Sequence, residues 1–154
     1  MSDPELEEAV RQLERVARTG RRPDRFLARA VLLALGRQVG KQGEGSLDPW
    51  RERIRKACDQ IGDAWEEAAV AELALACEEH IRSVDPRYLD LPDYDYEYTI
   101  HARERLEDRL AAARELGLEV PGDLLQGVFR ADRTLADRVG GKGDPSMDWN
   151  PGLS

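Results

Sequence analysis

The sequence is poor in cysteine and in long apolar runs. Its two cysteines, Cys58 and Cys77, are too few for a disulfide framework, which fits a reducing compartment. The longest apolar run, residues 30–35, is far shorter than the roughly 20 residues that cross a bilayer. Residues 1–13 are acidic and lack the apolar stretch of a secretory signal. We therefore expect a cytoplasmic protein without a membrane segment.

Strand-forming residues and familiar catalytic motifs are also scarce. Valine and isoleucine are sparse, whereas the helix formers alanine, leucine, arginine and glutamate dominate. No Gly-x-Ser-x-Gly elbow occurs, and the glycines of residues 40–46 lack the spacing of a phosphate-binding loop. We predict an all-α fold. It is a single-domain bundle of five to six helices over residues 1–140, with an irregular acidic, tyrosine-rich connection and a flexible Gly/Pro-rich C-terminal tail at 141–154.

Prolines and glycines indicate where the helices begin and end. Asp3-Pro4 and Asp48-Pro49 each indicate an N-cap followed by proline at the first helical position, and Asp85-Pro86 opens a shorter helical turn. Gly117 followed by Leu118 is typical of a C-cap. The third predicted helix is either one helix or two in tandem around Gly62. The predicted helices span residues 4–18, 23–39, 49–81, 99–116 and 123–139.

The second predicted helix is apolar almost all round over residues 26–35, which predicts burial at the centre of the bundle. Arg29 interrupts this stretch. Its long side chain either reaches water at the edge of the bundle or forms a buried ion pair with an acid of residues 59–99. The cost of burying a charge favours the first interpretation.

Charge is distributed very unevenly along the chain. Residues 21–58 carry ten basic and four acidic side chains, whereas residues 59–99 carry two basic and twelve acidic ones. The acidic block ends in a segment that alternates acids with tyrosines, residues 93–98. Such segregation points either to a partner of opposite charge or to internal pairing between the two blocks on neighbouring helices.

The alternating segment and the apolar residues of the tail favour an interaction protein that is not an enzyme and needs no cofactor. Tyrosine and tryptophan are enriched at interaction hot spots, and flanking acids steer a basic partner. We expect another protein with a basic surface as the partner, since the net charge of −8 disfavours direct nucleic-acid binding. An inhibitor, an immunity-type protein or a small subunit of a larger bacterial complex fits this pattern. The predicted partner-binding residues are Tyr88, Asp93, Tyr94, Asp95, Tyr96, Glu97, Tyr98 and Trp149.

One alternative is a calcium-responsive protein. Residues 93–104 place oxygen-bearing side chains and His101 at the spacing of an EF-hand loop and end in Glu104, the position of the bidentate ligand. However, Tyr98 occupies the position where the sharp turn needs glycine, and Pro92 disturbs an entering helix.

A second alternative is a hydrolase that uses carboxylates and histidines. It requires His80, His101 and two acids to share one cleft, and the sequence supplies no reason for this. The same histidines with Cys58 and Cys77 are zinc-ligand types, but both cysteines lie on apolar helical stripes, where free cysteine acts as a small hydrophobe. We therefore predict neither a metal site nor catalytic residues.

Overall fold

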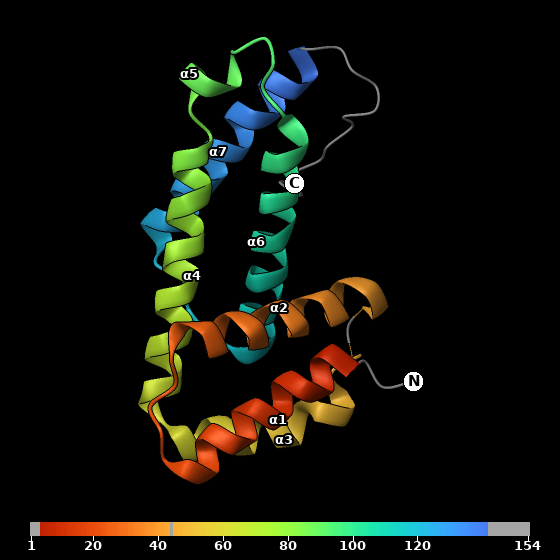
Figure 1. Cartoon of the computed structure of the whole chain (residues 1–154), viewed down its shortest axis with the longest axis vertical. Helices are drawn as coiled ribbons and strands as arrows, with labels where there is room; N and C mark the ends of the chain where they lie inside the picture. Colours follow the sequence, from red (N-terminus) through yellow and green to blue (C-terminus); the bar gives the residue numbers. More distant parts are fainter. Residues whose placement is uncertain (1–3, 44, 142–154) are drawn as a thin grey trace. The chain divides into compact units, whose positions relative to one another are not determined.

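The computed structural model describes residues 4–43 and 45–141, and in these residues it confirms the all-α prediction. They form seven helices and no strand (Figure 1). The number exceeds the predicted five to six, because Gly62 divides the third predicted helix and the turn after Asp85 forms a helix of its own. The predicted tail beyond residue 141 lies outside the described residues. The helices are α1 (Pro4–Thr19), α2 (Arg25–Gln42), α3 (Asp48–Ile61), α4 (Asp63–Ser83), α5 (Pro86–Leu89), α6 (Tyr96–Leu116) and α7 (Gly122–Gly141).

Most helix ends follow the local signals of the sequence. Asp24 caps α2 by accepting the Leu27 N–H at 2.8 Å. Gly62 has a φ of 79° and its N–H donates to the Cys58 carbonyl, so the chain turns sharply between α3 and α4. The prediction for Asp48 is wrong by one residue. It is the first residue of α3 rather than its N-cap, and its carboxylate contacts Arg51 instead.

The chain divides into two compact units. The first combines Met1–Leu73 with Glu107–Glu119, and the second combines Ala74–Leu106 with Val120–Ser154. Consequently α4 and α6 each contribute residues to both units.

The first unit is built around α1, which packs against both α2 and α3 (Figure 1). Its apolar stripe is buried, with residues such as Leu6, Val10 and Leu13 fully shielded from solvent. The central part of α2 is buried as predicted, but Phe26, Arg29 and Ala30 face solvent. Arg29 forms no ion pair within the described part of the chain, which agrees with the solvent-reaching interpretation.

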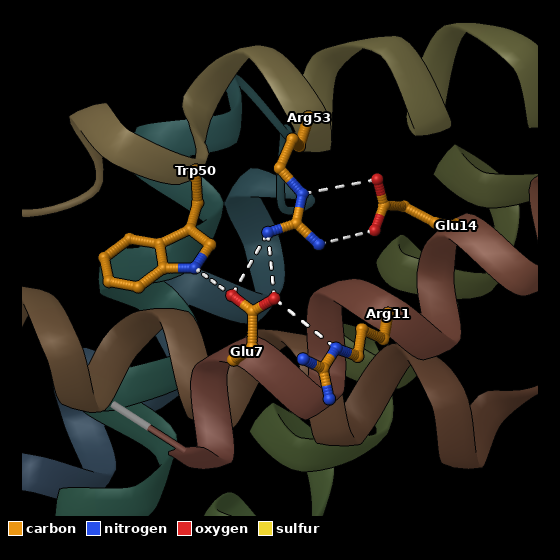
Figure 2. A network of polar contacts seen from close by, with 5 residues as sticks. All are labelled: Glu7, Arg11, Glu14, Trp50 and Arg53. Carbon is orange, nitrogen blue, oxygen red and sulfur yellow. Dashed lines mark hydrogen bonds and ion pairs between the residues drawn. The ribbon is translucent and has the colours of Figure 1, made fainter. Parts of the chain in front are cut away.

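A polar network fastens α1 to α3 (Figure 2). Glu7 accepts hydrogen bonds from the Trp50 indole at 2.9 Å and from Arg53, while Glu14 accepts from the other side of the same guanidinium. Arg11 adds an ion pair to Glu7 at 3.4 Å. These contacts lower the pKa of both carboxyl groups below their ordinary value of 4.5, with Trp50 and Arg53 as the main causes for Glu7 and Arg53 for Glu14. The network therefore remains charged well into mildly acidic conditions.

The second unit has a small core of its own. It comprises Val84, Leu89, Tyr96, Ile100, Ala131 and Leu135, with Ile81 and Tyr94 packed against it. These residues come from α4, α5, α6 and α7 and from the connections before α5 and before α6. This unit therefore also holds the predicted acidic, tyrosine-rich segment. None of the helices in the described part of the chain combines the length and apolar character that a membrane crossing needs.

Candidate functional site

The tyrosines of residues 88–98 divide into buried and exposed members. Tyr96 is buried, and its hydroxyl donates a hydrogen bond to the Leu89 carbonyl. Tyr94 is half-buried with its ring edge-on to that of Tyr96, the centroids being 5.2 Å apart, and its hydroxyl bonds to that of Thr99. Tyr94 and Tyr96, predicted as partner-binding residues, therefore anchor the segment to the core of its unit.

Tyr88 and Tyr98 remain exposed, at 54% and 69% of their surface. Leu91, which the sequence prediction missed, is 51% exposed between them in the chain. No periodic pattern identifies Leu91, because it lies in the irregular stretch after α5. Trp149 lies outside the described residues. We call the exposed residues of this segment the acidic-aromatic surface: Tyr88, Leu91, Asp93, Asp95, Glu97 and Tyr98.

The three acids of the acidic-aromatic surface are exposed, and none of them forms an ion pair with another described residue. Asp95 accepts the Glu97 backbone N–H at 3.0 Å and so caps the start of α6. Neighbouring acids behave differently, since Asp90 pairs with Arg138 at 2.8 Å and Asp85 pairs with Arg87.

Internal pairing between the basic and acidic blocks occurs, but it involves other residues. Arg22 pairs with Glu67 and Arg25 pairs with Glu72. Other arginines of the basic block pair outside the acidic block, as Arg53 does with Glu7 and Glu14. Among residues 4–43 and 45–141, internal ion pairing therefore does not involve the acids of residues 93–97.

Residues 93–104, which the calcium alternative requires as a loop, do not form one. From Tyr96 onward they belong to α6, where Thr99 is buried and His101 contacts Glu104 at 3.3 Å. Among the described residues no group of three or more histidine, cysteine, aspartate or glutamate side chains is arranged to hold a metal ion. The helical start at Tyr96 overturns the EF-hand geometry, because a calcium loop needs turning backbone at these positions.

A buried charged cluster was missed by the sequence prediction. Asp132 of α7 is inaccessible to solvent and lies 2.7 Å from His80 Nε2 of α4 and 2.8 Å from Arg103 Nε of α6. An ionised carboxylate only accepts hydrogen bonds, so Nε2 carries the proton of the imidazole. Burial alone would raise the pKa of Asp132, but the hydrogen bonds from His80 and Arg103 outweigh it and lower the pKa. The sequence did indicate that Asp132 is buried, because Asp132 lies on the same inward helical stripe as Val128 and Leu135.

The two histidines that the hydrolase alternative requires in one cleft are not brought together. His80 is enclosed with Asp132, whereas His101 is exposed beside Glu104. The imidazole–carboxylate pair resembles the orienting half of a nucleophilic triad, but a 2% exposed imidazole side chain does not meet a substrate in solution. The cluster acts as a structural link between three helices. Cys58 is no nucleophile either, because burial raises the pKa of its thiol to about 12.

Comparison with protein-family models, with curated proteins and with solved structures gives no match.

The division between anchoring and exposed tyrosines predicts opposite results for two matched substitutions. Tyr96→Phe should lower the free energy of unfolding by about 1–2 kcal/mol, because the Leu89 carbonyl loses its hydroxyl donor in a buried place. Tyr98→Phe should change it by less than about 0.5 kcal/mol, since Tyr98 is exposed. Urea denaturation followed by circular dichroism measures both. Equal losses would contradict the assignment of Tyr96 as the anchor.

Proposed function

We propose that this chain is a non-enzymatic interaction module that recognises a basic surface of another protein through its acidic-aromatic surface. The observation that carries the proposal is the combination of two exposed tyrosines with three exposed carboxylates that no described residue neutralises. Exposed aromatic side chains supply contact area at low entropic cost, and unpaired acids supply long-range attraction.

Anchoring by Tyr94 and Tyr96 supports this function physically. A short irregular segment normally loses conformational freedom when it binds, and that loss weakens affinity. Here the buried Tyr96 hydroxyl and the Tyr94 contact already hold the segment against its unit, so less freedom remains to be lost. An inhibitor, an immunity-type protein or a small subunit of a larger bacterial complex would use such a preordered acidic surface.

Site-specific photo-crosslinking in the protein's own host tests the proposal. A photoreactive phenylalanine derivative replaces Tyr98, and the captured protein is identified by mass spectrometry. We expect one basic protein, and we expect Asp93→Lys with Glu97→Lys to reduce its capture roughly tenfold or more, because two attractive charges become repulsive. Asp95 stays unchanged, since it caps α6.

The matched control applies the same charge change elsewhere. Glu78 and Glu79 are exposed on α4 and lie outside the acidic-aromatic surface. Glu78→Lys with Glu79→Lys should leave capture intact, and rising salt should weaken capture by the unaltered surface. Equal loss with both pairs, or no capture at position 98, would reject the proposal.

A further inference from the structure

The first unit contains a groove of about 700 Å³ that lies away from the acidic-aromatic surface in sequence. It is lined by α3, by the first turn of α4 and by the end of α6 with the residues after it. Volumes of this size are typical of sites for small organic ligands. The apolar part of its lining consists of Leu47, Ile54, Cys58, Trp65, Leu116 and Leu118.

The interior of the groove is lined by buried apolar side chains. Ile54 and Trp65 are almost fully buried, and Cys58, lying between them in the chain, is largely covered. Burial raises the pKa of the Cys58 thiol to about 12, so this side chain stays neutral under ordinary conditions. An apolar ligand group that enters the groove leaves water for apolar surroundings, and this transfer is favourable.

The rim of the groove carries an excess of negative charge. Arg51 pairs with Glu115 and Arg55 pairs with Asp59, each at 3.1 Å, so these four rim charges cancel. Two further rim acids, Asp63 and Glu66, are exposed and form no ion pair with any described residue. They are three residues apart in the first turn of α4 and therefore lie on one face of that helix.

The position of Asp63 and Glu66 at the start of α4 explains part of this charge arrangement by itself. Acids in a first turn are favourable beside the positive end of the helix dipole. That effect explains why Asp63 and Glu66 are tolerated, but it does not explain an apolar groove beside them. The two features together define a ligand with an apolar body and a positive group at one end.

We propose that this groove binds a small organic cation, with its apolar body against Ile54, Cys58 and Leu118 and its ammonium or guanidinium group between Asp63 and Glu66. The site is independent of the proposed protein partner. Cation recognition uses the two unpaired rim acids, and the arginines of the rim stay engaged with Glu115 and Asp59.

A matched pair of probes tests the charge preference on the full chain. The probes are n-octylammonium and n-octanoate, which share an apolar body and differ in the sign of the charge. Proton–nitrogen NMR correlation spectra follow the backbone amides during each titration. We expect n-octylammonium to shift amides of α3, of the first turn of α4 and of residues 115–118, and n-octanoate to leave them unchanged.

Removing the two negative charges at the rim tests whether Asp63 and Glu66 bind the cation. Asp63→Asn with Glu66→Gln should weaken n-octylammonium binding roughly fivefold or more, because both attractive charges disappear. Glu78→Gln with Glu79→Gln removes the same charge outside the groove and should leave the affinity unchanged. Equal shifts by both probes, shifts confined to other residues, or unchanged affinity in the rim variant would each overturn the proposal.

Discussion

Gly36→Ala is expected to destabilise the protein by about 3 kcal/mol or more. A Cβ atom at this position of α2 would lie 1.8 Å from the Asp108 backbone oxygen of α6, far inside any permitted contact. Because the obstacle is backbone, no side-chain rotation relieves it, and the two helices must move apart within the first unit. Urea denaturation followed by circular dichroism should show an earlier midpoint with helicity retained at low denaturant.

Gly40→Ala is the matched control on the same helix. Its Cβ would lie 3.8 Å from the nearest Asp108 carboxylate oxygen, an ordinary contact, and residue 40 is exposed. Since alanine favours helix over glycine, this variant should be stabilised by about 0.5–1 kcal/mol. Similar behaviour of the two variants would show that α2 and α6 do not approach as closely as described.

Asp132→Ala is expected to cost about 3–5 kcal/mol, a large share of the 5–15 kcal/mol typical of a domain. The change removes the carboxylate that accepts hydrogen bonds from both His80 and Arg103. Asp137→Ala, an exposed change on the same helix, should alter the free energy of unfolding by less than about 0.5 kcal/mol. A cost below 1 kcal/mol for Asp132→Ala would mean that the cluster contributes little.

The pH dependence of this loss follows from the lowered pKa of Asp132. A carboxyl group whose pKa is lower in the folded than in the unfolded protein stabilises the fold above its unfolded value, here 3.8. That stabilisation is lost as the pH falls through the folded value. The difference in unfolding free energy between the unaltered protein and Asp132→Ala should therefore narrow below pH 3.8. Denaturation curves at a series of acidic pH values measure it, and a difference that widens below pH 3.8 would contradict the lowered pKa.

Local signals in the sequence predicted the helices well. Gly117 ends α6 through a positive φ angle, and proline follows Asp85 at the start of α5, as the sequence predicted. Gly62 also has a positive φ angle and ends α3, but the sequence left open whether it divides one helix into two. These effects act within a few residues of the chain and need no knowledge of the tertiary structure.

The tyrosines of residues 94–98 show that the residue pattern alone does not predict which side chains are buried. Tyr94, Tyr96 and Tyr98 alternate with acids in the sequence, and all three were predicted as partner-binding residues. The helix begins at Tyr96, however, and two residues along a helix are about 200° apart around its axis. Tyr96 therefore points into the core, while Tyr98 points outward. Which of the two is buried depends on the residue at which the helix begins.

Pairings distant in sequence were beyond prediction for a different reason. Arg103 and Asp132 are 29 residues apart and meet only because α6 and α7 pack within the second unit. The inward position of Asp132 was readable from its stripe, but its partners were not. Likewise, the acid with which each arginine of the basic block pairs depends on which helix lies opposite that arginine.

The interleaving of the two units has a consequence for the protein during its synthesis. The first unit needs residues 107–119, so it cannot be completed when residue 73 leaves the ribosome. Until residues 107–119 have been made, the surface around Gly36, which the Asp108 backbone covers in the finished fold, stays uncovered on the nascent chain. Translation of the rest of α4, of α5 and of the first half of α6 therefore precedes the segment that completes the first unit, and during this interval α1, α2 and α3 lack their last covering segment.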